Sequence, residues 1–441
     1  MMFSLSKHKT FRGGVHPPEY KHPSKDKPFE IMPLPKRIIV PLSQHLGKPA
    51  LSLVKKGSEV KTGSVIAEAQ GVVSSPIHSP VTGKVTAVTT TVNTSGFPKE
   101  SIIIEPSEIE EFDFLPTLNC ETISAEEIIE RVRLAGIVGQ GGAAFPASVK
   151  LSPPKDKKID YIILNGCECE PYLTRDYRYM LEQPEAVLAG LQLIMKATGV
   201  DKGIVGIEDN KPLAIESMKK AAKTFNNISV EAVETKYPQG AEKMLIKALN
   251  GREVPPGKLP LDSGIIVQNI GTAVSIYVAV VKGEPSITAA LTITGNGIKE
   301  SKNLIVRVGT PIDEVLNYCG GVTNDAIKVV VGGPMMGVSQ YDFSAPVMKA
   351  TSGILVLTKQ EVAEKPETPC LRCGKCVEAC PVNLIPTKLA RYSQLGKIEE
   401  AEALDIRVCM ECGTCAYTCP ANIPLVQWIR LGKKKVMEKV K

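Results

Sequence analysis

Clustered cysteines constrain this chain more than any other feature of its sequence. Eight of its twelve cysteines lie in two segments, PCLRCGKCVEACP and VCMECGTCAYTCP, which both follow the spacing CxxCxxCxxxCP. The amino terminus lacks the apolar core and cleavage site of a secretory signal, so we expect a cytoplasmic chain whose thiols are reduced. Repeated thiols in that setting indicate metal coordination rather than disulfides.

The spacing is typical of bacterial ferredoxins that hold two 4Fe-4S clusters, each on three thiolates of one motif and the fourth of the other. A structural zinc site is the plainer alternative, but two CxxC pairs would need only four thiols. The segment between the motifs has a helical pattern, which predicts an α-helical two-cluster domain over residues 366–430. The expected ligands are Cys370, Cys373, Cys376 and Cys419 for one cluster, and Cys409, Cys412, Cys415 and Cys380 for the second.

Composition excludes several classes of protein. With 441 residues, 43% apolar and 23% charged, the chain should be a soluble globular protein with several cores. The longest charge-free stretch, residues 263–281, is interrupted by polar residues and is not expected to span a membrane. The net charge of +6 is modest and aromatic residues are scarce, so no nucleic-acid partner is expected. A basic tail over residues 431–441 is better explained as a solvated helix end than as a docking segment.

The pattern along the chain predicts a multidomain α/β and β architecture. A Pro-rich, His-rich stretch lacks any period and predicts an extended arm over residues 1–35. Short β-branched runs between glycine turns predict a barrel-sandwich-like β domain over residues 36–110. Alternating strands and helices then predict a Rossmann-like α/β domain with a parallel sheet over residues 111–282. Short strands around one helix predict a β-grasp module over residues 283–350.

Two segments of the α/β domain carry candidate binding residues. The loop GIVGQGGAAFPASVK has closely spaced glycines and a lysine, which allow backbone amides and a positive charge to approach a phosphate. The segment NGCECEPY follows a strand and brings an asparagine and two glutamates to the carboxyl edge of the sheet, where α/β proteins bind ligands. Taken alone, the loop is as compatible with a plain turn, and the two glutamates with an exposed charged turn.

A family resemblance gives these segments a context. The loop GxGGAAFPxxxK, the segment NGCECEPY, and the segments YPQGAEKMLIKALNGREVPP and VQNIGTA resemble the flavoprotein subunit of respiratory complex I. The segments FRGGVHPPEYK, PLSQHLGKPA and SPIHSPVTGKV resemble the C subunit of the Rnf electron-transport complex. The region of residues 283–347 resembles the soluble-ligand-binding β-grasp domain of the same relatives.

The resemblance implies FMN and NAD(H) as cofactors beside the two clusters. Phe145 would stack near the nicotinamide, with Lys150 beside the flavin and Glu170 and Glu242 around the nucleotide. Two positions depart from the complex I pattern, since Cys167 and Ala241 stand where that protein has acidic residues. The FMN would be held by Gly139, Gly141, Gly142, Lys150, Asn165, Glu168, Tyr237, Gly240, Asn269 and Thr272.

The implied function is that of a peripheral subunit on the cytoplasmic face of the inner membrane. It would exchange electrons between NAD(H), FMN and the clusters as an NAD:ferredoxin oxidoreductase. Integral-membrane and ferredoxin-like subunits would be its partners, translocating ions, and ferredoxin would be met indirectly. One alternative is a flavin and iron–sulfur cobalamin reductase of a microcompartment. Another is an electron-wiring subunit that has lost nucleotide binding, for which Cys167 and Ala241 give support.

Overall fold

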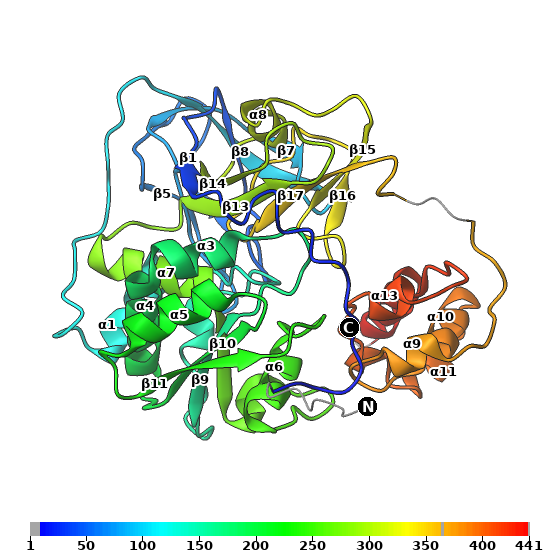
Figure 1. Ribbon diagram of the computed structural model, residues 1–441. Coiled ribbons are helices and arrows are strands. Elements are labelled where there is room, and N and C mark those ends of the chain that lie inside the picture. The colour runs from blue at the N-terminus through cyan, green and yellow to red at the C-terminus, as the bar shows by residue number, and fades with distance from the viewer. Residues whose placement is uncertain (1–8, 363–365, 440–441) are drawn as a thin grey trace.

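The computed structural model describes residues 9–362 and 366–439. Four β-sheets and their helices form a main body, and a smaller helical lobe at the carboxyl end lies beside it (Figure 1). The amino-terminal segment descends from the main body along the side that faces this lobe. Among the described residues, no helix is both long and apolar enough to cross a membrane.

Two small antiparallel sheets build the first β domain. Their buried side chains, including Ile38, Ile66 and Ile102, form one shared core. Two sheets packed on a common core are the expected barrel-sandwich arrangement. One sheet contains β2 (Ile38–Pro41), β8 (Pro98–Pro106), β7 (Gly83–Val92) and β4 (Glu59–Val60), and the other contains β3 (Leu51–Ser52), β5 (Val65–Glu68) and β6 (Ile77–His78).

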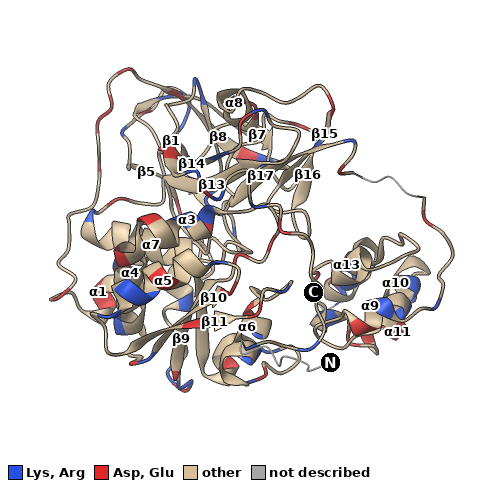
Figure 2. Ribbon diagram, in the orientation of Figure 1, with Lys and Arg blue, Asp and Glu red and all other residues tan. Residues whose placement is uncertain are grey.

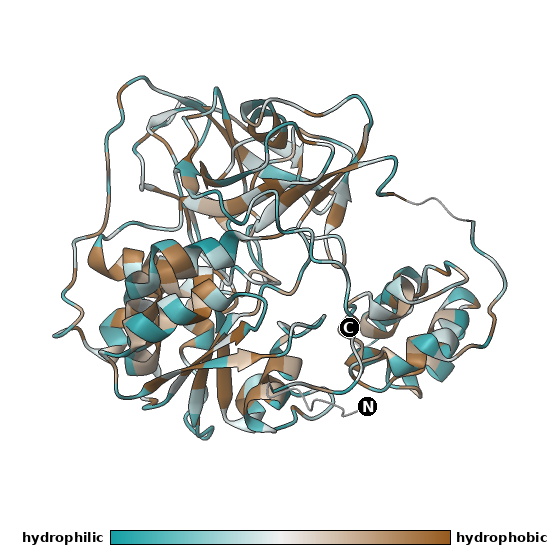
Figure 3. Cartoon of the chain, viewed as in Figure 1, coloured by the Kyte–Doolittle hydropathy of each residue, from teal (hydrophilic) through white to brown (hydrophobic). Residues whose placement is uncertain are grey.

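A parallel sheet forms the centre of the α/β region. Its strands run in the order β11 (Ile228–Val233), β10 (Gly203–Glu208), β9 (Tyr161–Gly166) and β12 (Ile265–Asn269). Side chains alternate between faces, so Ile162 packs in the core with most of the helices and Ile163 packs in the core with α6 (Glu242–Asn250). Because both faces are covered, the central strands β9, β10 and β12 are mostly apolar, and their polar residues stand at the carboxyl ends (Figure 3).

The remaining helices of this region have recognisable starts. A capping box between Ser124 and Glu127 begins α1. The charge-free stretch of residues 263–281 becomes β12 and the largely buried α7. The helices are α1 (Ala125–Leu134), α2 (Ala147–Lys150), α3 (Arg175–Glu182), α4 (Pro184–Thr198), α5 (Pro212–Ala222), α7 (Ile270–Val281) and the 3-10 helix η1 (Pro260–Ser263).

A mixed six-stranded sheet forms the rest of the main body and packs against α8 (Ile312–Tyr318). This sheet extends beyond the expected module of residues 283–350. It includes β17 from the later chain and, at one edge, β1 from the supposed arm, which pairs with β14. Its order is β1 (Phe29–Ile31), β14 (Lys302–Arg307), β13 (Thr288–Thr294), β17 (Gly353–Thr358), β15 (Ala326–Val331) and β16 (Val338–Gln340).

The cysteine-rich lobe is helical and has its own core. The expected boundary of a basic tail at residue 431 falls inside α13, where Gly432 and Val436 are buried. Lys433 of this helix pairs with Glu411, and charges of both signs cover the lobe (Figure 2). The lobe contains α9 (Lys375–Glu378), α10 (Pro386–Gln394), α11 (Ile398–Glu402), the 3-10 helix η2 (Ile406–Val408), α12 (Thr414–Tyr417) and α13 (Leu425–Glu438).

Candidate functional site

The carboxyl ends of β9 and β12 place Asn165 and Asn269 opposite each other in the strand register. The chain runs outward from β9 to β10 and β11, and then returns to the other side of β9 as β12. Open α/β sheets bind their ligands where the strand order reverses in this way. The two predicted asparagines therefore meet at the position that the fold favours for a ligand.

Asn269 is a hub of hydrogen bonds at this position. Its Oδ1 accepts from the backbone N–H of Gly271 at 2.8 Å and from Nη2 of Arg175 at 3.2 Å. Its Nδ2 donates to Oδ2 of Asp176 at 2.7 Å. The first contact caps α7, and the other two tie β12 to the start of α3.

The predicted glycine loop is fastened to α7. The backbone N–H of Gln140 donates to Oγ1 of Thr272 at 3.0 Å, and its side-chain amide donates to Oγ of Ser275 at 2.7 Å. The loop is closed on itself because the N–H of Gly139 donates to the carbonyl of Phe145 at 2.9 Å. Phe145 is half-buried at the end of this loop.

Two glycines of the loop have different surroundings. A Cβ on Gly141 would lie 2.9 Å from Cβ of Asn269, which is closer than real contacts allow. A Cβ on Gly142 would meet no atom within 4 Å. Gly141 is therefore needed for packing on the strand end, whereas Gly142 faces open space that a ligand can use.

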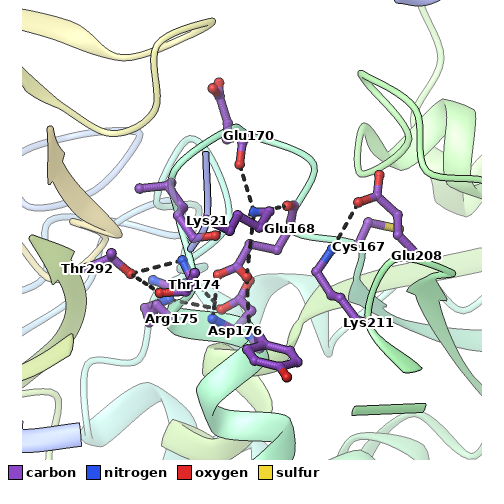
Figure 4. A network of polar contacts seen from close by, with 12 residues as sticks. Lys21, Cys167, Glu168, Glu170, Thr174, Arg175, Asp176, Glu208, Lys211 and Thr292 are labelled. Carbon is purple, nitrogen blue, oxygen red and sulfur yellow. Dashed lines mark hydrogen bonds and ion pairs between the residues drawn. The ribbon is translucent and has the colours of Figure 1, made fainter. Parts of the chain in front are cut away.

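Glu168 lies in the turn after β9, with a left-handed φ of 47°. Its carboxylate accepts from the backbone N–H groups of Asp176 at 2.7 Å and Tyr177 at 3.3 Å (Figure 4). It therefore caps the amino terminus of α3, where backbone donors lack partners and the helix dipole favours negative charge. Burial raises the pKa of Glu168 to about 7, and the positive charge of Lys21 opposes this shift.

The carboxylate of Glu170 points away from that of Glu168 (Figure 4). It accepts from the backbone N–H groups of Met335 at 3.0 Å and Met336 at 2.9 Å, in the loop between β15 and β16. Burial raises the pKa of Glu170 to about 7. Glu170 thus joins the turn to the six-stranded sheet, and its role beside the nicotinamide nucleotide stays a prediction.

Lys150 and Glu242 form an ion pair of 2.5 Å between α2 and α6. The pair connects the end of the glycine loop with the segment that follows Gly240. Ala241 is the residue before α6, so Glu242 lies in the first turn of that helix. The departure at Cys167 is buried in the core, where its thiol lies 3.9 Å from the carbonyl of Gly206.

The loop after β11 faces two parts of the molecule. Nδ2 of Asn165 donates to the carbonyl of Gly240 at 2.6 Å, so this glycine lies at the switch point. Tyr237 instead points toward the cysteine-rich lobe, where its hydroxyl donates to the carbonyl of Cys412 at 2.7 Å. Between them, the side-chain amide of Gln239 is buried, and neither its nitrogen nor its oxygen has a partner among the described residues. Such a group fits a site that binds a further polar molecule.

The cysteines of the lobe gather across the two motifs. A small cavity is lined by Cys380 together with Cys409, Cys412 and Cys415. Among the described residues, no three His, Cys, Asp or Glu side chains converge closely enough to hold a single metal ion. One thiol of the first motif and three of the second thus line the same cavity.

The thiols of the other set lie nearer the surface. Burial raises the pKa of Cys376, and the nearby thiol of Cys419, which belongs to the second motif, adds to this rise. Cys370 and Cys373 are exposed at the edge of the lobe. Two relationships therefore cross from one motif to the other: Cys380 lines a cavity with cysteines of the second motif, and Cys376 lies near Cys419.

Several residues of this network were not found from the sequence. Arg175 donates to the carbonyl of Gln140 at 3.2 Å and to Asp176 at 2.7 Å, which links the glycine loop to α3. Lys21 reaches the turn of Glu168 from the amino-terminal segment. The adjacent opposite charges of Arg175 and Asp176 directly after NGCECEPYLT were the one available signal, since a buried pair next to a ligand turn is unusual.

Family models match four parts of the chain. The models are described as the RnfC barrel sandwich hybrid domain at residues 9–108, the Nuo51 FMN-binding domain at 132–278, the SLBB domain at 291–339 and the 4Fe-4S dicluster domain at 369–423. The FMN-domain match spans the glycine loop, the turn after β9 and both asparagines. The dicluster match includes all eight cysteines of the two motifs.

Curated relatives resemble nearly the whole chain. The C subunit of the proton-translocating ferredoxin:NAD(+) oxidoreductase complex of Clostridium ljungdahlii is 48% identical over 89% of this chain and 86% of its own length. The C subunit of the Na(+)-translocating complex of Acetobacterium woodii is 45% identical over 90% of each chain. The C subunit of the ion-translocating oxidoreductase complex of Rhodobacter capsulatus is 42% identical over 98% of this chain and 84% of its own length.

A solved structure shares the fold. The NAD+-reducing [NiFe]-hydrogenase in its air-oxidized state matches with a TM-score of 0.50 and 18% identity, over 71% of this chain and 63% of the hydrogenase chain.

Proposed function

The chain belongs to the family of C subunits of ion-translocating ferredoxin:NAD(+) oxidoreductase complexes, and from this premise we propose that it exchanges electrons between NAD(H), FMN and two 4Fe-4S clusters. When bound, FMN exchanges electron pairs with the nicotinamide and single electrons with the clusters. The residues of the chain bind and orient these groups. The same proposal includes a Rossmann-like fold for residues 111–282 and a β-grasp fold for residues 283–350.

FMN binding is assigned to the switch point between β9 and β12. The open space at Gly142 and the unpartnered amide of Gln239 both support a bound polar molecule there. Two hydrogen bonds fix the side chain of Asn165 and three fix that of Asn269, so little side-chain entropy is left to lose on binding. The proposed FMN residues are Gly139, Gly141, Gly142, Lys150, Asn165, Glu168, Tyr237, Gly240, Asn269 and Thr272.

NAD(H) binding is assigned to the outer side of this site. Phe145 is half-buried on the glycine loop, and Glu242 begins α6 across from Lys150. Hydride transfer needs no acid or base from the protein, so these side chains act by orienting the nucleotide and excluding water. Glu170 supports the site by holding the turn against the loop of Met335 and Met336.

One observation carries the route from the flavin site to the clusters. The hydroxyl of Tyr237 lies 2.7 Å from the carbonyl of Cys412 and is buried at the contact between main body and lobe. The cluster on Cys380, Cys409, Cys412 and Cys415 is therefore proximal to the flavin site. The cluster on Cys370, Cys373, Cys376 and Cys419 is distal, and its exposed cysteines offer the exit to another protein.

The chain works as one subunit of a larger complex. We assign it to the cytoplasmic face of the inner membrane, with integral-membrane and ferredoxin-like subunits as direct partners and ferredoxin as an indirect one. Ion translocation then falls to the partner subunits.

NADH added to the anaerobic, FMN-loaded chain tests the proposal. Rapid bleaching of the flavin absorbance is expected. Absence of bleaching in a chain that binds FMN and carries both clusters would favour the electron-wiring alternative. Co-purification with a microcompartment shell instead of membrane subunits would favour the cobalamin reductase.

A further inference from the structure

A lysine from the amino-terminal segment is buried in the turn that follows β9. Lys21 is 9% exposed, and its Nζ donates to the carbonyls of Glu168 at 2.9 Å, Glu170 at 3.0 Å and Leu173 at 2.5 Å. Oε2 of Glu168 lies 4.0 Å from the same nitrogen (Figure 4). Three carbonyl acceptors need three N–H donors, which only the protonated ammonium group supplies.

The turn depends on a positive charge at this point. Glu168 and Tyr172 both have left-handed backbone conformations, with φ values of 47° and 69°. Such conformations cost free energy in residues other than glycine, and the surroundings must hold them in place. The three carbonyls of Glu168, Glu170 and Leu173 converge on one spot, so their partial negative charges repel one another unless a cation lies between them.

The neighbouring contacts of the same segment fasten it without reaching Glu168. The N–H of Tyr172 donates to the carbonyl of Glu19 at 2.8 Å, and the rings of Tyr20 and Tyr172 stack with centroids 4.9 Å apart. Ser24 Oγ lies 2.8 Å from Oγ1 of Thr174. Several contacts therefore hold the amino-terminal segment on the main body. Within this group of contacts, only Lys21 binds the carbonyls of the turn.

We propose that Lys21 is a positioning residue of the flavin site: its ammonium group fixes the turn that carries Glu168, directly after Asn165 at the end of β9, and supplies a positive charge beside it. The proposal rests on the proposed function, because it assigns FMN to these residues. The amino-terminal segment then completes the site rather than only covering it. Removal of the charge should weaken FMN binding and lower the flavin midpoint potential, since a nearby cation favours reduced, anionic flavin.

The chain provides a matched control. Lys27 lies on the same segment, and its Nζ donates to the carbonyl of Ser301 at 2.7 Å, away from the turn of Glu168. If lysines of this segment only fasten it to the main body, Lys21→Ala and Lys27→Ala should have the same consequences. If Lys21 positions the turn, only its replacement should change the flavin.

A cavity beside Lys21 allows a sharper test. The cavity has a volume of about 200 Å³, and Lys21 lines it together with Glu19, Cys169, Glu208 and Tyr237. A small alkylammonium ion can enter such a space and replace the missing ammonium group of Lys21→Ala. Ethylammonium at millimolar concentration is the probe, and the same concentration of tetramethylammonium, which lacks N–H donors, is its control.

The experiment uses the full chain with both clusters reconstituted. FMN affinity is measured by quenching of flavin fluorescence, and the flavin midpoint potential by an anaerobic redox titration. We expect Lys21→Ala to raise the FMN Kd at least tenfold and to lower the potential, ethylammonium to restore most of the affinity, and Lys27→Ala to match the wild type. Unchanged affinity and potential in Lys21→Ala, or equal losses in Lys27→Ala, would overturn the proposal.

Folding and the proposed function are controlled separately. If Lys21→Ala does not fold, Lys21→Gln keeps two N–H donors without the charge and should show the lower potential with a smaller loss of affinity. A wild-type chain that binds no FMN would contradict the proposed function itself. A wild-type chain that binds FMN while both Lys21 variants bind it equally well would contradict only the role of Lys21.

Discussion

The hydroxyl of Tyr237 donates a hydrogen bond to the backbone carbonyl of Cys412, a cysteine of the second motif, at 2.7 Å. Tyr237 is 1% exposed and belongs to the loop after β11, three residues before Gly240. The amino-terminal segment is in the same contact, because the N–H of Gly14 donates to the carbonyl of Ala379 at 2.9 Å. The main body and the lobe thus meet between the proposed flavin site and the proposed cluster ligands, and electron transfer between these two sites requires a short distance.

Tyr237→Phe should slow electron transfer between the flavin and the clusters several-fold. The ring stays, but the link to Cys412 is lost, at a cost of about 1 kcal/mol for a buried hydrogen bond. Rapid mixing with NADH measures flavin bleaching and cluster reduction separately. Bleaching should slow less than cluster reduction, because the ring beside the proposed FMN site stays and only the hydroxyl that points toward the lobe is lost. Tyr417→Phe, an exposed tyrosine of α12, is the control and should change neither rate.

Double cysteine variants test the pairing of thiols across the motifs. Cys370→Ser with Cys419→Ser removes two ligands of the same proposed cluster and should leave about four iron atoms per chain. Cys370→Ser with Cys380→Ser removes one ligand of each cluster and should leave far fewer. Iron and sulfide analysis after anaerobic reconstitution measures the difference. The opposite order of iron contents would mean that each motif binds its own cluster.

Alanine at two adjacent glycines separates packing from ligand binding. Gly141→Ala should destabilise the FMN-free chain by about 1–3 kcal/mol, because its Cβ overlaps Asn269. Gly142→Ala should leave the melting temperature of the FMN-free chain unchanged and still raise the FMN Kd, since its Cβ enters the open space. Thermal unfolding and flavin fluorescence measure the two effects. Normal FMN binding by Gly142→Ala would count against the assigned site.

Lys349 should make the free energy of unfolding depend on pH in the range between neutral and alkaline. It is fully buried, and its Nζ donates to the carbonyls of Pro76 at 2.9 Å and Gly136 at 2.8 Å. Burial lowers the pKa of Lys349 from 10.5 to about 7. Between these values the unfolded chain holds a proton that the folded chain has released, so this residue makes the free energy of unfolding rise with pH, by up to about 1.4 kcal/mol per unit.

Lys349→Met removes this dependence. The difference in unfolding midpoint between wild type and variant should therefore shift in favour of the wild type as the pH rises from neutral into the alkaline range. Denaturation at several pH values measures it. A difference that is constant with pH would show that Lys349 stays charged in the folded chain.

The sequence predicts the parallel sheet well because its signals are local. In α4, for example, Pro184 starts the helix and Gly199 ends it in a left-handed conformation, and both are visible in the sequence. The predicted asparagines meet because adjacent parallel strands end at the same edge. The pairing of Cys380 with the second motif likewise follows from spacing alone.

Other contacts depend on partners far apart in the chain and carry no local pattern. Glu170 accepts hydrogen bonds from the backbone of Met335 and Met336, which are 165 and 166 positions further along the chain. Lys21 reaches a turn about 150 positions away. The amino-terminal segment has no period, so neither β1 nor the buried position of Lys21 is visible from its residues. The sequence predicts Glu168 only as a flavin ligand. Its capping of α3 depends on how the turn between β9 and α3 folds, and no local pattern shows that fold.

The central claim is that one chain carries a complete route between NAD(H) and two clusters. The most direct measurement mixes the fully loaded chain, reduced chemically under anaerobic conditions, with excess NAD+ and counts the NADH formed. Two electrons from FMN and one from each cluster predict close to two NADH per chain, and none from a chain without FMN. A yield of one NADH or less, with the clusters still reduced, would contradict the account.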